Sequence, residues 1–100
     1  MNNMPKKLRE QLSNDPYYKK CARENGDCEG RITWEHCWIY AGKQIQEAWA
    51  IIALCWRHHL GDLLDKKINQ KISLKRATPE DFAKYPRKDW KTLQSTLLTP

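Results

Sequence analysis

The stretch CWRHH at residues 55–59 decides the fold expected for this chain. Cys55 and His58 have two residues between them, a spacing that lets one turn present both side chains to a single metal ion. Upstream, Cys21 and Cys28 flank a turn-forming stretch, as the first ligand pair of a zinc knuckle does. We therefore predict that these four side chains form one closed tetrahedral zinc site. Such a metal would contribute folding energy directly.

Other uses of the cysteines are open. Cys37 is a rival ligand, but on a strand it would face away from His36 and pack in the core. The four cysteines could instead form two disulfides in a secreted domain. However, the N-terminal residues contain no apolar signal-peptide core, and the longest apolar run, residues 48–56, is too short to span a bilayer. We expect a cytoplasmic protein whose cysteines are reduced.

The composition indicates a small soluble domain with a polyanionic partner. The chain has 100 residues, of which 40% are hydrophobic and 30% charged, and its formal net charge is +6. The hydrophobic core of a domain this small gives only marginal stability unless a metal ion or a disulfide adds to it. The positive charge favours nucleic acid or another polyanion as the partner, although a solvated basic surface is the alternative. The basic residues lie towards the two ends: Lys6, Lys7, Arg9, Lys19, Lys20 and Arg23, then Lys66, Lys67, Lys71, Lys75 and Arg76.

Local patterns predict one α+β domain over residues 1–100, with a core at about 21–72. Leu8 and Leu12 form the buried edge of a basic helix over residues 5–12. Thr78 is a helix N-cap followed by proline. We also expect a strand over 31–40, a loop or single helical turn over 44–47 and a returning strand over 49–54. A helix should follow over about 57–72, because leucine or isoleucine recurs every fourth residue from 60. A helical tail over 78–98 should end in a helix over 88–98.

Glu35, His36 and His59 remain outside the predicted zinc site, and such a set is what a metal-dependent hydrolase needs. With Trp34-Glu35-His36 as the first element and residues 55–59 as the last, the sequence resembles the HNH endonucleases, which have the ββα-metal fold. The zinc-knuckle subset, including phage endonuclease VII-type junction resolvases, is most similar. The resemblance covers about residues 21–72, and a weaker one extends to small phage or prophage proteins, which would place the protein in the host cytoplasm.

The resemblance implies metal-dependent hydrolysis of DNA phosphodiester bonds. Glu35 and His59 would hold a divalent ion such as Mg²⁺ or Mn²⁺, and His36 would act as the general base. Neighbouring strand residues face opposite ways, so Glu35 and His36 need a bulge or a strand end to converge. Asp62, three residues after His59, is a further candidate ligand, or else a solvated acid in a first helical turn.

One departure from the family pattern is important. Ala50 occupies the position where the family carries an asparagine that braces the base, and Gln44 or Gln46 could replace it. This departure keeps two other functions open: a non-catalytic zinc-bound DNA-binding or recombination accessory module, and a zinc-stabilised protein-interaction domain. If His58 and His59 bound the same zinc, no catalytic ion would remain.

The expected DNA contacts involve the phosphate backbone and little sequence reading. Of the five tryptophans, Trp56 could stack on a splayed base, but core packing is expected for it and for most of the others. A homodimer is an open alternative to a monomer.

Overall fold

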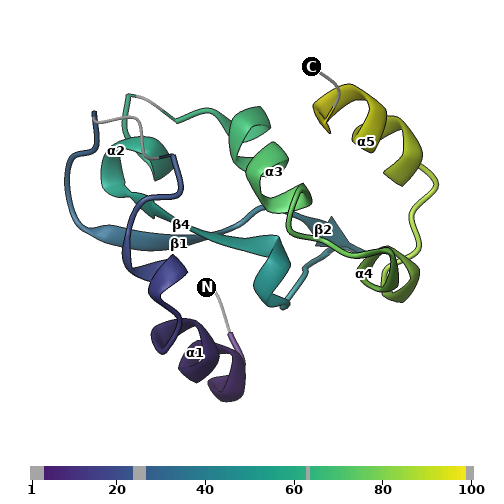
Figure 1. Ribbon diagram of the computed structural model, residues 1–100, viewed down its shortest axis with the longest axis horizontal. Helices are drawn as coiled ribbons and strands as arrows, with labels where there is room; N and C mark the ends of the chain where they lie inside the picture. The colour runs from purple at the N-terminus through teal and green to yellow at the C-terminus, as the bar shows by residue number, and fades with distance from the viewer. Residues whose placement is uncertain (1–3, 24–26, 63, 99–100) are drawn as a thin grey trace.

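The computed structural model describes residues 4–23, 27–62 and 64–98 and shows a small α+β fold. Two short antiparallel sheets are surrounded by helices (Figure 1). No helix within these described ranges is long and apolar enough to cross a membrane. In chain order the elements are α1 (Lys6–Ser13), the 3-10 helix η1 (Pro16–Lys19), β1 (Ile32–His36), β2 (Ile39–Tyr40), β3 (Lys43–Gln44), the 3-10 helix η2 (Ala48–Ala50), β4 (Ile51–Cys55), α2 (Trp56–His59), α3 (Lys66–Leu74), α4 (Pro79–Lys84) and α5 (Trp90–Leu98).

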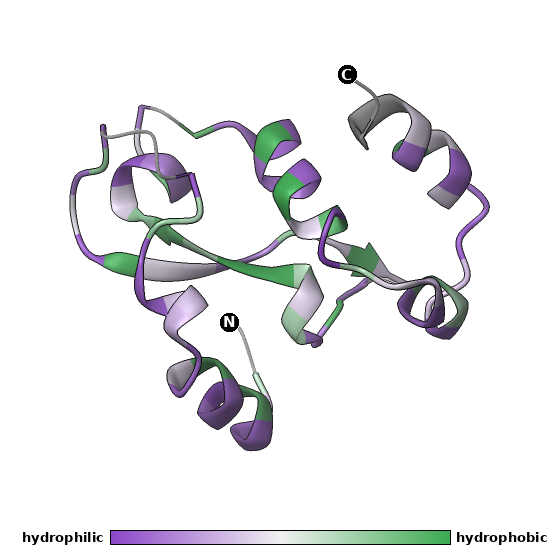
Figure 2. Cartoon of the chain, viewed as in Figure 1, coloured by the Kyte–Doolittle hydropathy of each residue, from purple (hydrophilic) through white to green (hydrophobic). Residues whose placement is uncertain are grey.

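The centre of the fold is an antiparallel pair formed by β1 and β4. Its register places Ile32 opposite Cys55 and His36 opposite Ile51. All five β4 residues are buried, and Figure 2 shows this strand as a hydrophobic band through the middle of the molecule. Because a strand buried on both faces can pack against two layers at once, β4 supplies side chains to both hydrophobic clusters of the protein.

One hydrophobic cluster lies on each face of this pair. On one face, Ile52 and Leu54 pack with Leu74 of α3 and with Trp90 of α5. On the other face, Ile51 and Ala53 pack with the α1 side chains Leu8 and Leu12 and with Tyr18 of η1. The alternation of strand side chains therefore assigns each β1 residue to a side. Thr33 and Glu35 share the face of Ile52 and Leu54, whereas Trp34 and His36 share the α1 face.

The predicted helix signals at both ends are confirmed. Leu8 and Leu12 are buried under α1, which ends before Asp15, whose side chain accepts a hydrogen bond from the backbone N–H of Tyr17 (2.9 Å). Thr78 caps α4, and Asp81 completes a reciprocal capping box with it. These signals depend on residues within a few positions of one another, which is why the sequence alone identifies them.

The predicted continuous helix over residues 57–72 is wrong. The chain forms a single turn, α2, and begins again at α3, where the Asp65 side chain accepts from the N–H of Ile68 (3.2 Å). The chain passes so close to Trp56 after this turn that only glycine fits at position 61. A Cβ atom there would lie 2.8 Å from Cζ3 of Trp56. The chain therefore turns tightly against α2. As a result, Leu60, Leu64 and Ile68 do not form a buried stripe and are 63%, 39% and 40% exposed.

The two predicted strands are also shorter than expected. The first ends at His36, and Ile39–Tyr40 pairs instead with Lys43–Gln44 in a small second hairpin. Its turn residues, Ala41 and Gly42, both have positive φ (53° and 79°), which is the backbone of a tight two-residue hairpin turn. The returning strand begins at Ile51 rather than at residue 49, because η2 occupies residues 48–50.

Three of the five tryptophans form the aromatic part of the larger cluster. The ring of Trp90 lies 5.4 Å from that of Trp38 and 6.2 Å from that of Trp49, between centroids. Trp34 is half-buried. Core packing of Trp56 was the wrong expectation, since this side chain is 50% exposed. It belongs to the one-turn helix α2 and lies over Gly30 and Gly61 at the edge of the fold.

Candidate metal centre and adjoining pocket

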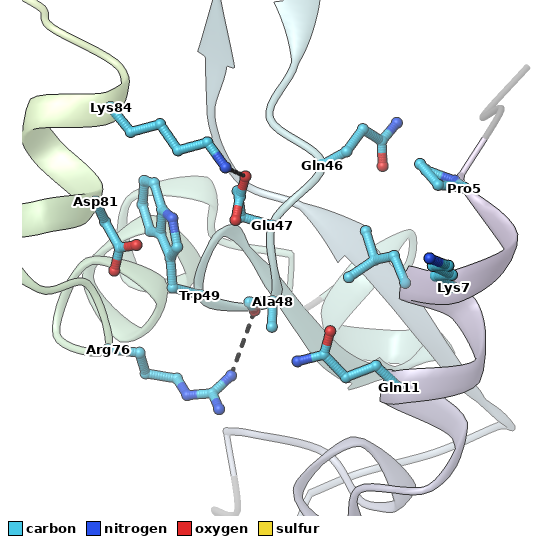
Figure 3. Close-up of a pocket in the computed structure, with 11 residues that line it drawn as sticks. Pro5, Lys7, Gln11, Gln46, Glu47, Ala48, Trp49, Arg76, Asp81 and Lys84 are labelled. Carbon is cyan, nitrogen blue, oxygen red and sulfur yellow. Dashed lines mark hydrogen bonds and ion pairs between the residues drawn. The ribbon is translucent and has the colours of Figure 1, made fainter.

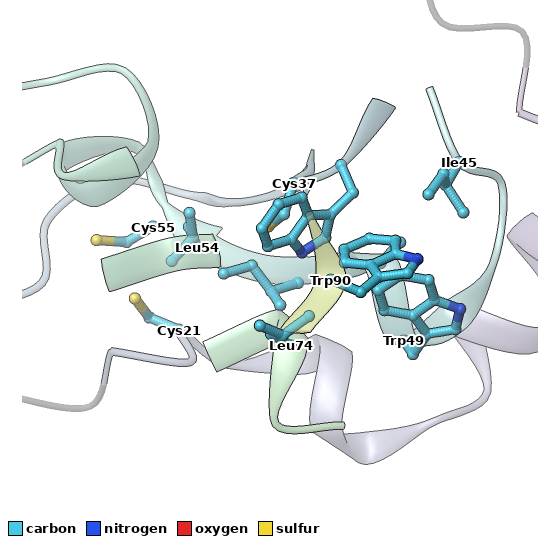
Figure 4. Close-up of a cluster of buried hydrophobic side chains, with 11 residues drawn as sticks. Cys21, Cys37, Ile45, Trp49, Leu54, Cys55, Leu74 and Trp90 are labelled. Carbon is cyan, nitrogen blue, oxygen red and sulfur yellow. The ribbon is translucent and has the colours of Figure 1, made fainter. Parts of the chain in front are cut away.

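Four side chains from separate segments converge beside α2. Cys21 follows η1, Cys28 precedes β1, Cys55 ends β4 and His58 lies within α2. Their ligand atoms all lie within 4.8 Å of one another, as the spacing of these residues predicts. Figure 4 shows Cys21 and Cys55 together at one end of the larger hydrophobic cluster. In the part of the chain that the structure describes, no other group of three or more Cys, His, Asp or Glu ligands is as close.

The geometry of this cluster fits a tetrahedral metal ion. His58 Nδ1 lies 3.0 Å from the sulfur of Cys55, 3.5 Å from that of Cys21 and 3.8 Å from that of Cys28. Zn–S and Zn–N bonds of ordinary length at tetrahedral angles place nitrogen and sulfur roughly 3.6 Å apart. The donor set, three sulfurs and one imidazole nitrogen, is also one that zinc prefers.

The electrostatics of the cluster favour a bound cation. Burial opposes ionisation of Cys55, but hydrogen bonds from the Glu29 and His58 backbone, and then from the His58 ring, lower its pKa to about 6. Desolvation, together with the nearby thiols of Cys21 and Cys55, raises the pKa of Cys28 to about 12. Three thiolates cannot share so small a volume without a positive charge, and a divalent metal supplies it.

The imidazole of His58 is held from its outer side by Asp27. Oδ1 of Asp27 lies 3.0 Å from Nε2 of His58, a ring that is fully buried. The guanidinium of Arg57 in turn contacts the Asp27 backbone oxygen (3.4 Å). A carboxylate on the far nitrogen of a ligand histidine fixes the ring and raises its basicity. In the sequence, Asp27 belongs to a turn-forming stretch, and only its position directly before Cys28 indicates a role beside the metal ligands.

Cys37 does not belong to the metal cluster. It is buried on the α3 face, and its sulfur lies 3.6 Å from the backbone oxygen of Asn69. Burial, and then the nearby Glu35, raise the pKa of its thiol strongly. The expectation that Cys37 packs in the core is confirmed, and Figure 4 shows it among the tryptophans, away from Cys21 and Cys55.

Glu35 and His36 line one pocket of about 270 Å³. His36 is the last residue of β1, so the two neighbours meet at a strand end. Oε2 of Glu35, whose carboxylate lies beside the Asn69 side chain, and Nδ1 of His36 are both buried and make no hydrogen bond within the described ranges. Unpaired buried polar atoms are rare, and in a pocket they indicate a missing polar ligand or water. The other lining residues are Cys37, Ile39, Gln44, Lys66 and Gln70.

The surroundings of Glu35 disfavour its charge. Burial raises its pKa, and the nearby side chains of Asn69 and Lys66 offset this rise only in part. A carboxylate in such a place costs stability unless a cation or a proton compensates it.

Gln46 holds the second pocket residue, His36. Oε1 of Gln46 lies 2.9 Å from Nε2 of His36, so this amide braces the imidazole across ten residues of sequence. Ala50, where the HNH pattern carries asparagine, is fully buried and offers only its backbone oxygen, which accepts from the N–H of Cys37 (2.8 Å). Of the two glutamines named as possible substitutes for that asparagine, Gln46 is the one that contacts His36.

His59 and Asp62 lie outside this pocket. Nδ1 of His59 is 2.6 Å from the hydroxyl of Thr33, and burial lowers the pKa of the His59 ring. Both oxygens of Asp62 bind the guanidinium of Arg57, at 2.9 and 3.2 Å, and this contact lowers the pKa of Asp62. Glu35 and His36 therefore line one pocket from the two faces of the strand end, and His59 lies outside that pocket, in contact with Thr33.

A larger hollow of about 800 Å³ lies between α1, residues 46–49 and α4 (Figure 3). Two of its charged groups bind each other: Lys84 reaches the Glu47 carboxylate (2.6 Å). Arg76 points at the backbone oxygen of Ala48 (3.5 Å). None of the predicted metal ligands or catalytic residues lines this hollow.

No known family matches. Comparison with protein-family models, with curated proteins and with solved structures gives no significant match for any part of this chain. The function therefore has to be argued from its own residues.

Proposed function

We propose that this protein is a zinc-stabilised, metal-dependent endonuclease of HNH type that hydrolyses DNA phosphodiester bonds. The observation that carries the proposal is the pocket in which Glu35 and His36 meet, each with one buried polar atom lacking a partner. The Cys3His cluster supports it, because a structural zinc there would join the segments before β1 to the end of β4. This arrangement is the one that the resemblance to HNH nucleases leads us to expect.

The chemistry proposed for the pocket divides among its residues. His36, braced at Nε2 by Gln46, would take a proton from the attacking water at Nδ1. Lys66, which lines the same pocket, would bind a phosphate oxygen as a point charge. Glu35 and His59 would hold the divalent ion, which would supply Lewis-acid stabilisation of the leaving oxygen. A bound cation would also compensate the buried Glu35 carboxylate, whose pKa burial raises.

DNA is the polyanion that we propose as substrate. The formal net charge is +6, and most of the lysines and arginines lie outside the pocket, where they would hold backbone phosphates without reading sequence. The exposed ring of Trp56, directly beside the metal ligand Cys55, could stack on an unpaired base. Binding should weaken steeply between low and moderate salt.

A non-catalytic zinc-bound DNA-binding module is the second candidate. Two observations favour it: His59 is hydrogen-bonded to Thr33 and does not line the pocket of Glu35 and His36, and Asp62 is occupied by Arg57. In such a module the zinc cluster and the basic surface would remain, and the second ion would be absent.

Nicking of supercoiled plasmid by the zinc-loaded protein, with Mg²⁺, Mn²⁺ or Ni²⁺ added, separates the two candidates. We expect cleavage by the wild type, loss of cleavage in His36→Ala and retention in Lys43→Ala, an exposed neighbour of the pocket. Zinc content measured on every sample controls for folding. Absence of cleavage with all three ions, in protein that retains zinc and binds DNA, would overturn the nuclease and favour the binding module.

A further inference from the structure

The hydroxyl of Thr33 has two partners, and together they define the protonation of His59. Oγ1 of Thr33 lies 3.1 Å from the backbone oxygen of Leu54 and 2.6 Å from Nδ1 of His59. A hydroxyl has one hydrogen to donate, and a carbonyl oxygen can only accept. With its hydrogen donated to Leu54, the oxygen of Thr33 accepts a hydrogen bond from His59. In that arrangement Nδ1 of His59 carries the hydrogen and Nε2 has a free lone pair.

We propose that Thr33 is a positioning residue that holds His59 in the Nδ1–H tautomer, so that Nε2 is presented as a ligand for a divalent cation. This inference rests on the proposed nuclease function for its purpose, but the tautomer itself follows from the contacts of Thr33. A histidine with a bare Nε2 accepts a cation and cannot donate a hydrogen to a phosphate oxygen there. His59 is thereby assigned as a metal ligand rather than as a general acid.

The position of Thr33 is well suited to this role. Its partner across the β1–β4 pair is Leu54, whose carbonyl it contacts, so both ends of the contact belong to the central sheet. Its β-branched side chain has few rotamers, which restricts where the hydroxyl can point. The ring that it orients belongs to α2, which also carries His58 of the Cys3His cluster.

Glu35 supplies the second expected ligand on the same side of the sheet. Thr33 and Glu35 are two residues apart on β1, on the face that packs against α3. Two residues along a strand separate side chains by about 6–7 Å. Nε2 of His59 and the carboxylate of Glu35, whose Oε2 makes no hydrogen bond among the described residues, would hold the cation.

The contrast with His58 supports the assignment. Nε2 of His58 faces Asp27 and its Nδ1 faces the three sulfurs, so that ring presents Nδ1 as its ligand atom. The two adjacent histidines thus each have one nitrogen engaged by an oxygen, but the engaged nitrogen differs. This difference directs the free nitrogens of His58 and His59 to two separate sites.

The tautomer can be read directly from the ring nitrogens. Long-range ¹H–¹⁵N NMR spectra of the zinc-loaded full chain, with His59 assigned through His59→Gln, should show Nδ1 protonated in the wild type. Thr33→Ser keeps the hydroxyl and should preserve this signature. Thr33→Val removes it, and the Nε2–H form should become populated. Mn²⁺ binding measured by electron paramagnetic resonance should weaken by about 10- to 100-fold in Thr33→Val and be rescued in Thr33→Ser.

These readouts distinguish failure of the inference from failure of the proposed function. A wild-type His59 protonated at Nε2, or a Thr33→Val protein with unchanged tautomer and unchanged Mn²⁺ affinity, would overturn the inference even if the protein cuts DNA. A wild-type protein without Mn²⁺ binding would overturn the ligand role. Conversely, Nδ1 protonation with Thr33-dependent Mn²⁺ binding would support the inference even if plasmid remains uncut. Zinc content and thermal melting show that each variant is folded.

Discussion

His58 and His59 are consecutive residues whose imidazole rings make opposite contacts. Nδ1 of His58 faces the sulfur of Cys55 at 3.0 Å, whereas Nδ1 of His59 faces the hydroxyl of Thr33 at 2.6 Å. Successive residues in a helical turn point about 100° apart, so one short helix can supply two different sites. This relationship underlies both parts of the proposed function, a structural zinc and a reactive ion beside it.

The metal content should follow the cluster membership. We expect one zinc per chain, lost in Cys55→Ser and retained in both His59→Ala and Cys37→Ser, because Cys37 packs in the core away from the cluster. Removal of the metal by a chelator should unfold the domain, since the ion joins four segments of a small protein and its binding free energy contributes to folding. Elemental analysis and circular dichroism measure both outcomes. Zinc retained by Cys55→Ser would contradict the assignment.

Asp27 should control how tightly the zinc is held. Replacing its carboxylate in Asp27→Asn weakens the contact with Nε2 of His58, which lies 3.0 Å away, and loss of such an outer partner lowers metal affinity by about 10- to 100-fold. The matched control is Glu29→Gln, a neighbouring acid whose side chain is 76% exposed. Competition with a chromophoric chelator gives both affinities. Equal affinities in the two variants would show that Asp27 does not support the metal.

Gln46 should affect catalysis through His36. Its Oε1 lies 2.9 Å from Nε2 of His36, so it holds that nitrogen protonated and leaves Nδ1 as the basic atom. A positioned general base contributes about 10²- to 10⁴-fold to a rate, and Gln46→Leu should lose about tenfold or more of it. Single-turnover cleavage of plasmid measures the loss. Gln11→Leu on α1 is the control, and an equal effect there would contradict the bracing role.

Tyr85 should make stability fall at alkaline pH. Burial raises the pKa of Tyr85, and its hydrogen bond to Glu47 (2.6 Å) raises it further, to about 12 from the usual 10. The folded state therefore keeps this proton when the unfolded chain has lost it. The resulting stability is complete below about pH 10 and is lost as the pH rises through the folded value near 12.

Thermal melting at two pH values tests this linkage. Tyr85→Phe should melt a few degrees below the wild type at pH 8, because one partly buried hydrogen bond is lost. The difference should shrink at about pH 11, and Glu47→Gln should show the same loss at pH 8. A difference that does not change with pH would show that the Tyr85 hydroxyl contributes no such linkage.

Trp90 and Trp56 should differ sharply in their contributions to folding. Trp90 is 6% exposed and packs against Trp38, Trp49 and Phe82, so Trp90→Ala should cost about 3–5 kcal/mol. Trp56 is 50% exposed, and Trp56→Ala should cost about 1 kcal/mol or less. Urea denaturation in the presence of zinc measures both, with Trp90→Phe as the milder change if the alanine variant does not fold. Equal costs would contradict the placement of α5 in the core.

Residue types and short-range spacing determined much of this protein. The Cys3His ligands could be predicted because only a few residue types bind zinc and because Cys55 and His58 lie within one turn of chain. The buried edge of α1 and the Thr78 capping box followed from local periodicity and capping chemistry. Cys37 could be assigned to the core because side chains alternate in direction along an extended chain, so that Cys37 faces away from its neighbour His36.

Tertiary structure alone decided the remaining features, because they depend on contacts between residues distant in sequence. Gly61 ends the first helical turn because the Trp56 ring lies against it, and periodicity therefore predicted a helix that is too long. The partners of the three histidines, Gln46 for His36, Asp27 for His58 and Thr33 for His59, lie 10 to 31 residues away from them. A sequence pattern indicates which side chains can carry chemistry. The packing of β1 against β4 and α2 determines which nitrogen of each ring is free to do so.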